Sequence, residues 1–357
     1  MTLRKREETL KVSEEKPKKG LNLRTLIIYF CIIAGIYAAF LGPSILKPIS
    51  PVVVLPAEPT GLSIAGFEIT NTMLATLIAD LILLSIAVFV VRKFVRSGSL
   101  IPSGFYNAFE ALVEFLWNTV EGAAGKWAFR IFPVPATIFL LIFVANLVKL
   151  VPGFESIGRI KEVHHGYGYA PVLLAKVGNL SIYTIDKAQK REHIAKEGEH
   201  SEGHGEEEKL CEACEIVPFL RGSATDLNFP FALAFIAVLM TQVYGVWALG
   251  IGYFEKFFPI RQLIKGGAMG VINFIVGILE LILEFAKILS FGFRLFGNIF
   301  AGTLLLSIVG ALTAVLVPVG LYFFEVFFGI IQAYVFYLLA TIFISGATVS
   351  HHAEEAH

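Results

Sequence analysis

Long apolar runs alternate along the chain with short polar and charged segments. Each run holds roughly 17–25 residues or more, the length that a helix rising about 1.5 Å per residue needs to cross about 30 Å of hydrocarbon. The runs lack the alternation of a membrane β-barrel, so we expect no sheet. The pattern predicts an all-α integral membrane protein with about six transmembrane or membrane-embedded helices, at residues 25–42, 71–91, 134–151, 229–252, 268–312 and 319–346.

Two segments depart from a simple perpendicular span. The run 268–312 is longer than one crossing and rich in glycine, so we expect it to be tilted or bent and to form a long tilted hairpin with 319–346. Residues 103–129 place apolar side chains such as Leu112 and Leu116 at helical spacing, with glutamates elsewhere. This pattern predicts an amphipathic helix at the cytoplasmic interface.

Composition and charge support the membrane interpretation and orient the chain. Of 357 residues, 56% are hydrophobic and only 16% are charged, which is too apolar for a soluble domain of this length. The net charge is zero, so nothing suggests a nucleic-acid partner. Residues 4–24 hold eight basic and four acidic residues, whereas 155–226 hold nine basic and thirteen acidic residues. The positive-inside rule therefore predicts cytoplasmic N- and C-termini.

These features divide the chain into five parts. The first span could be a retained anchor or a signal peptide, although the preceding polar segment is long for a signal peptide. The parts are a basic cytoplasmic segment (1–24), the anchor or signal-like span (25–42), spans two and three with the interfacial helix (71–152), an extracytoplasmic polar insertion (153–226) and the ion-channel helices (227–350).

The insertion leaves three interpretations open. The charged, acidic composition of residues 190–215 is typical of a solvated loop, which we favour. One C-x-x-C with nearby imidazoles could instead bind a transition metal or form a local disulfide. Because a second C-x-x-C is absent and the histidines are irregularly spaced, we expect neither a metal site nor a cofactor. The residues concerned are His193, His200, His204, Cys211 and Cys214.

A polar stripe follows one face of the fifth run. Arg294 lies fourteen residues, or roughly 21 Å, from Glu280, which is too deep for easy snorkelling to the membrane surface. A central arginine costs at least about 2.5–3.5 kcal/mol on insertion scales, so its presence implies a function and a partner. At 100° per residue the stripe comprises Glu280, Glu284, Lys287, Phe291, Arg294, Asn298 and Gly302.

The sixth run carries a matching polar face. Glu325 and Gln332 are two turns apart, and Gly329 between them permits close helix contact. A lone glutamate in such a run is expected to titrate; a packed, protonated side chain without a role is the alternative.

Together these motifs resemble subunit a of the F-type ATP synthases. "FGFRLFGNIFAG" and "IIQAYVFYLLATIFIS" carry the resemblance, supported by "SGFYNAFEALVEFLWNTV", "ANLVKLVP" and "ATDLNFPFALAF". It implies a non-catalytic, ion-translocating stator subunit in a bacterial-type inner membrane. The implied partners are membrane lipid, a ring of c subunits, peripheral-stalk b subunits and other ATP synthase subunits. A stand-alone cation/proton antiporter or channel is the alternative, but no internal repeat of the arginine segment supports it.

The resemblance also implies roles for individual residues. Arg294 corresponds to the stator arginine that faces the ring carboxylate, between two aqueous half-channels. The sequence departs from the family at Thr303 and Lys149, where acidic residues are frequent. Asp80, deep in the second run, is either a replacement channel group or a helix-helix hydrogen-bond partner. The implied polar neighbours are Asn298 and Gln332, and the channel candidates are Asn146, Asp226, Asn228, Glu280 and Glu325.

Overall fold

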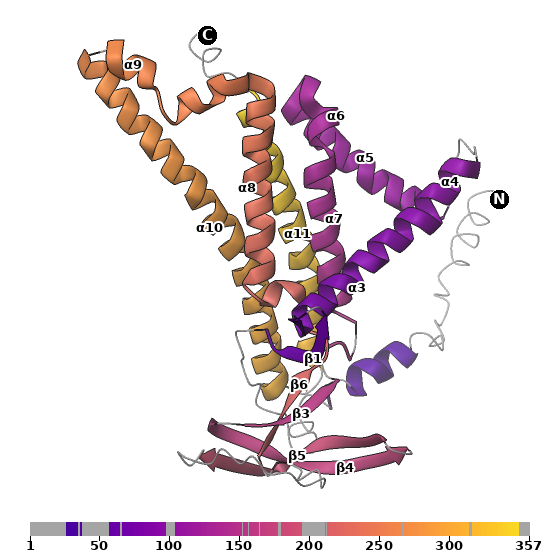
Figure 1. Cartoon of the computed structure of the whole chain (residues 1–357). Helices are drawn as coiled ribbons and strands as arrows, with labels where there is room; N and C mark the ends of the chain where they lie inside the picture. Colours follow the sequence, from indigo (N-terminus) through magenta and orange to yellow (C-terminus); the bar gives the residue numbers. More distant parts are fainter. Residues whose placement is uncertain are drawn as a thin grey trace, which may run out of the picture.

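The chain folds into a bundle of helices with small β-sheets at one end (Figure 1). The computed structural model describes residues 26–34, 36–37, 57–64, 66–97, 104–151, 153–155, 157–163, 165–177, 180–194, 211, 213–265, 267–313 and 316–349. Its labelled helices are α3 (Asn71–Ser85), α4 (Arg92–Ser97), α5 (Phe105–Ala124), α6 (Ala128–Ile131), α7 (Pro133–Val148), α8 (Asn228–Leu249), α9 (Ile260–Lys265), α10 (Gly267–Leu312) and α11 (Leu316–Ala347).

The helices confirm a multi-pass membrane protein. A fifth span exists if the pair Phe105–Ile131 and Pro133–Val148, bent by 96°, counts as one crossing. The first predicted run is helical at 26–34 and 36–37, and its remainder lies outside the described residues. In the described part of the chain, four helices are long and apolar enough to cross a membrane: Asn71–Arg96, Asn228–Lys256, Met269–Gly310 and Val317–Ala347.

The last two helices form the predicted hairpin. α10 is one continuous helix of 46 residues, roughly 69 Å long, and it runs obliquely to α8 in Figure 1. α11 returns over 32 residues and packs against α7 and α8 as well as α10. The length of α10 is therefore accommodated by slant, without a break in the helix.

The amphipathic helix α5 is fastened to α11. Leu116 and Val120 are fully buried, whereas the three glutamates of α5 are exposed, as its pattern predicts. The Tyr337 hydroxyl donates to the Leu116 carbonyl, and the Ser345 hydroxyl donates to the carbonyl of Ala123 at 2.6 Å. These bonds fix α5 on the bundle beside the core.

The expectation of no sheet is wrong outside the helical spans. A hairpin precedes α3, and the insertion forms a four-stranded antiparallel sheet of order β3-β6-β4-β5. Sheets are excluded only in hydrocarbon, and strands beyond it satisfy their backbone groups by pairing with each other. The strands are β1 (Pro59–Ile64), β2 (Phe67–Thr70), β3 (Gly158–Glu162), β4 (His165–Val177), β5 (Leu180–Ile194) and β6 (Cys214–Pro218).

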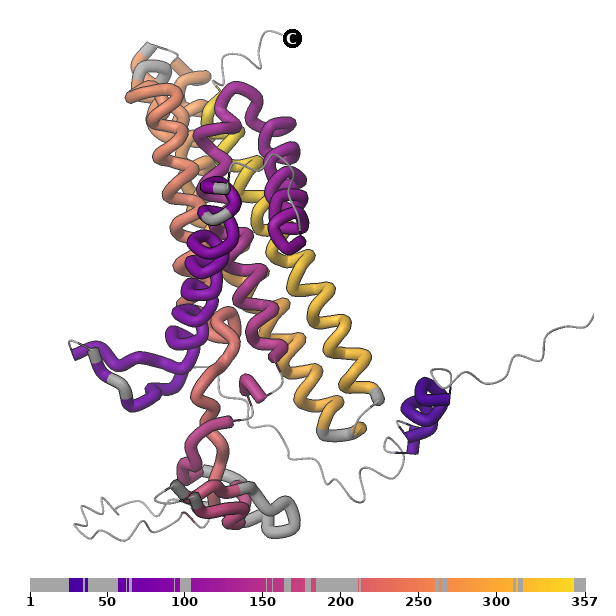
Figure 2. Tube along the Cα trace, turned by 90° about the vertical axis from the view of Figure 1, so that its right-hand side faces the viewer, coloured from indigo at the N-terminus to yellow at the C-terminus, as the bar shows by residue number. Residues whose placement is uncertain are grey.

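The insertion is thus structured over these strands, whereas most of the stretch 190–215 that we interpreted as a solvated loop lies outside the described residues. Cys211 and Cys214 form a disulfide, one of the three alternatives. No group of three or more potential metal ligands occurs among the described residues, and His200 and His204 lie outside them. The sheet lies beyond one end of the helices in both views (Figures 1 and 2).

Two hydrogen bonds join this sheet to the rest of the chain, one to β1 of the hairpin before α3 and one to the start of α3. Arg159 of β3 donates to the Pro59 carbonyl at 2.9 Å, and the Asn71 side chain donates to the Pro218 carbonyl at 3.3 Å. The base of the insertion is therefore attached to the bundle.

Candidate functional site

Arg294 lies on the outward side of α10. Phe291 and Leu295 are buried in the main core, with Phe291 against Phe336 of α11. Their burial fixes the rotation of α10 and leaves Arg294 exposed. Within the described residues Arg294 has no hydrogen-bond or ion-pair partner. The charge that the sequence singled out therefore faces away from its own chain.

One turn further, α10 and α11 share a polar contact. The Asn298 side chain donates to Gln332 Oε1 at 3.2 Å. Gln332 is buried, and its Nε2 has no hydrogen-bond partner in the described part of the chain. Gly329, one turn from Gln332, accepts a 3.2 Å hydrogen bond at its carbonyl from Asn146 of α7. The close helix contact predicted at Gly329 is present, and its partner is α7.

Glu325 is not the lone carboxylate that the sequence suggested. Lys149, directly after α7, lies 2.5 Å from Glu325 Oε1, and the two side chains are only 5% and 12% exposed. The pair joins segments 176 residues apart, so no local pattern could reveal it. The lysine therefore neutralises the carboxylate instead of standing as an unpaired charge.

Three neighbouring cavities run from the sheet end to this ion pair; we call them the sheet-side cavities. The first, about 210 Å³, extends from β6 to Thr303 on α10. The second, about 40 Å³, shares Thr303 and Glu155 with the first and contains Lys149 and Glu325. The third, about 230 Å³, shares the ion pair and reaches Asn298. Polar groups therefore connect the sheet end with the turn beyond Arg294.

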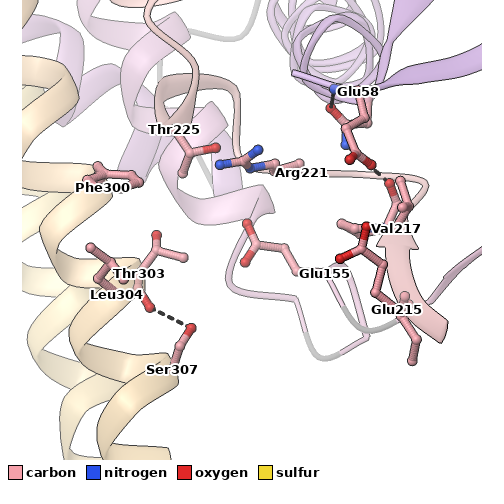
Figure 3. Close-up of a pocket in the computed structure, with 13 residues that line it drawn as sticks. Glu58, Glu155, Glu215, Val217, Arg221, Thr225, Phe300, Thr303, Leu304 and Ser307 are labelled. Atoms are coloured by element: carbon pink, nitrogen blue, oxygen red, sulfur yellow. Dashed lines mark hydrogen bonds between the residues drawn. The ribbon is translucent and has the colours of Figure 1, made fainter. Parts of the chain in front are cut away.

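Carboxylates surround Arg221 in the first cavity. Figure 3 shows Glu58 and Glu215 on the side opposite α10 and Glu155 between them and α10, with Arg221 reaching in beside Thr225. Burial lowers the pKa of the Arg221 guanidinium, and the nearby carboxylates, Glu155 foremost, oppose this shift. The mouth of the cavities is therefore lined with charged groups.

A second polar region lies toward the end that carries α9; we call it the α9-side cluster. The buried carboxylate of Glu284 accepts hydrogen bonds from Lys287 Nζ at 2.7 Å and from Gln242 Nε2 at 3.0 Å. Lys256 lies 2.7 Å from Glu280 and 3.7 Å from Glu284. Two carboxylates and two ammonium groups thus balance in charge. Tyr253 completes the cluster by donating to Gln242 Oε1 at 2.8 Å.

Arg294 lies between the two polar regions along α10. Glu284 is ten residues, about 15 Å, to one side, and Thr303 is nine residues, about 14 Å, to the other. The segment around Arg294 is closed toward the bundle by Phe291 and Leu295. Arg294 therefore lies on α10 between two polar regions, one toward each end of the bundle.

The remaining predicted residues occupy different environments. Asn146 connects α7 to α11 as described, and Asp226 is buried beside Thr72 of α3, which donates to it at 3.3 Å. Asn228 is exposed and donates to Asp226. Asp80 is exposed on α3 and lines none of the sheet-side cavities. None of these four residues lines the sheet-side cavities. Asn146 lies near the Lys149–Glu325 pair only because it holds α7 against α11.

Sequence reasoning missed several members of both regions. Gln242 is a lone amide in an apolar run, a signal that could have selected it, since polar groups in a span require partners. Lys256 and Tyr253 follow that run and resemble ordinary interfacial residues. Arg221 and Glu155 lie in charged loop sequence, where no periodicity distinguishes them.

Comparison with known proteins identifies the family of this chain. The sequence model of the ATP synthase A chain family matches residues 73–345. ATP synthase subunit a of Mycobacterium ulcerans is 28% identical over 283 residues, covering 78% of this chain and 86% of the relative. The subunit a of Sulfurihydrogenibium is 23% identical over 261 residues (73% and 89%), and that of Campylobacter jejuni strain RM1221 is 24% identical over 276 residues (76% and 88%). Because the match spans most of the chain, this protein belongs to the ATP synthase A chain family, the proton-transporting subunit a of the ATP synthase membrane sector.

Proposed function

We propose that the sheet-side cavities and the α9-side cluster belong to two aqueous half-channels and that Arg294 is the stator charge between them. A carboxylate on a rotating ring of c subunits passes Arg294 as an anion. It loses its proton to one half-channel and takes a new one from the other before returning to lipid. Arg294 keeps the half-channels apart because its guanidinium stays charged and repels a proton.

The observation that carries this proposal is the isolation of an exposed arginine between two polar regions. Its charge has no partner among the described residues of its own chain, and an unpaired charge at membrane depth is costly. A carboxylate on an adjacent subunit supplies the missing partner. The outward direction of Arg294 suits a ring that packs against α10 and α11.

We also propose that the sheet end lies outside the cytoplasm and that both termini lie inside. The Cys211–Cys214 disulfide at the sheet end supports this orientation, since disulfides persist in oxidising compartments. The basic segment 4–24 supports it independently. Peripheral-stalk b subunits complete the proposed set of partners.

Cysteine labelling tests the two half-channels. In a Cys31→Ser background, a membrane-impermeant maleimide should label Ser307→Cys only from the sheet side and Lys287→Cys only from the α9 side. Ser307 lines the first cavity and Lys287 belongs to the α9-side cluster, so each should be reached by water from one side. Right-side-out and inverted vesicles that contain the assembled complex expose one face of the membrane at a time to the reagent.

Leu289→Cys is the matched control for this labelling. Leu289 is 53% exposed on α10, but its position predicts contact with lipid, where the reagent does not react. Labelling of Ser307→Cys and Lys287→Cys from the same side would contradict the two-channel proposal.

A shortened insertion tests which part of the sheet serves transport. Removal of residues 186–210 should leave assembly and ATP-driven proton pumping within about twofold of wild type, since the described residues of this stretch, 186–194, line none of the sheet-side cavities. Removal of Cys214–Pro218 should abolish pumping, because β6 contributes one wall of the first cavity. Loss of pumping in a fully assembled 186–210 deletion would refute this division.

A further inference from the structure

We propose that Lys149 and Glu325 act as one proton-transfer unit, in which Lys149 keeps Glu325 from retaining the transported proton. This inference rests on the proposed half-channel and assigns Lys149 the part of a positioning residue. It explains how a lysine can stand in a proton path without blocking it, since its charge is compensated by the carboxylate that it contacts.

The geometry places the pair at a junction. Lys149 and Glu325 both line the second and third cavities, so a proton that moves from Thr303 toward Asn298 meets the carboxylate on the way. Glu325 Oε1 binds the ammonium at 2.5 Å, and within the described part of the chain no hydrogen bond or ion pair occupies its second oxygen. That second oxygen is the atom available for an incoming proton.

The charged surroundings of Glu325 determine what happens to that proton. Besides Lys149 from the end of α7, the titratable groups lining the two cavities are Glu155, from the segment after α7, and Tyr322 on α11 itself. α10 contributes the non-titrating Thr303 and Asn298. Among the described residues, Lys149 is therefore the only cation that lines these two cavities, and it contacts the carboxylate directly.

The transfer balances without any other reactant. A proton from the Thr303 side forms an O–H bond at the free oxygen of Glu325, which gives a neutral carboxyl beside an ammonium and a pair of net charge +1. The O–H bond then breaks and the proton leaves toward Asn298, which restores the neutral ion pair. Lys149 keeps its own protons throughout. The adjacent positive charge disfavours the protonated carboxyl and so promotes release.

The test compares Lys149→Met, Lys149→Arg, Glu325→Gln and Lys149→Met/Glu325→Gln in the assembled complex. Passive and ATP-driven proton flux are measured in vesicles across a pH series. We expect Lys149→Met to slow flux about fivefold at neutral pH and to move the acid side of its pH–rate profile up by about one pH unit. Without the ammonium, no positive charge beside the carboxyl repels the transferred proton, so its release toward Asn298 slows. Lys149→Arg keeps the charge and should retain the wild-type profile.

Two comparisons separate this role from a merely structural one. If the pair is one unit, the double variant should be no slower than Glu325→Gln alone, because both remove the same step. Lys161→Met, an exposed lysine of β3, is the control for loss of a lysine on the same side. Co-purification with the ring is measured for every variant.

Each outcome is decisive. An unchanged profile in Lys149→Met, a displaced profile in Lys149→Arg, or a further loss in the double variant would overturn the inference. If Lys149→Met fails to assemble, the Lys149→Arg profile and the double variant still decide. Wild-type flux in Glu325→Gln would overturn both this inference and the proposed path through the sheet-side cavities, whereas the outcomes at Lys149 overturn the inference alone.

Discussion

Arg294→Ala is expected to abolish coupled ATP synthesis and to make the assembled membrane sector leak protons. Without the guanidinium, nothing holds the ring carboxylate as an anion, and the barrier between the sheet-side cavities and the α9-side cluster disappears. We expect synthesis to fall at least ~10²-fold, the scale of losing a preorganised charge-stabilising group. ATP synthesis is measured in intact vesicles. Passive proton conductance is measured in vesicles stripped of the catalytic sector.

Arg294→Lys should also fail, which distinguishes the role of arginine from that of any cation. An ammonium is a point charge that loses its proton more easily when buried and lacks the planar fork of the guanidinium. Arg96→Ala, an exposed arginine at the end of α4, is the matched control and should couple normally. Normal ATP-driven pumping by either Arg294 variant would show that this residue is not the stator charge.

The helical part of the fold follows closely from the apolar runs. The prediction 268–312 matches α10, Gly267–Leu312, because burial in lipid demands an unbroken helix wherever the chain is apolar. The predicted run 134–151 extends beyond α7, which ends at Val148. Lys149 follows the helix and forms an ion pair with Glu325. The sheets were missed because the rule that excludes them applies only within hydrocarbon.

The candidate site was predictable only along each helix. Periodicity aligned Glu284, Arg294 and Asn298 on α10, since their spacing fixes their direction. It could not supply Gln242, which reaches Glu284 across 42 residues, or the Lys149 partner of Glu325. Contacts between distant segments depend on how the helices pack, and the residue pattern along one helix does not reveal that packing.

Glu325→Gln is expected to slow proton flux about ten- to a hundredfold, the lower range of what a positioned proton-transfer group contributes. Glutamine keeps the shape of the side chain but takes up no proton. The substitution also leaves Lys149, 5% exposed, as a buried and unpaired cation, which costs about 3–5 kcal/mol. Flux therefore has to be separated from stability, with assembly and thermal unfolding of the purified complex measured beside proton pumping.

The double variant Lys149→Met/Glu325→Gln makes that separation, because it removes both charges and leaves neither buried alone. It should assemble as stably as wild type and still transport slowly. Thr303→Glu in the Glu325→Gln background should restore part of the flux, since Thr303 lines the cavity that contains Lys149 and Glu325, and a carboxylate there can both pair with the ammonium and exchange a proton. Wild-type pumping by Glu325→Gln at every pH would mean that the outer half-channel needs no titratable group at this position, and the proposed path would then have to be moved toward Asp80 on α3.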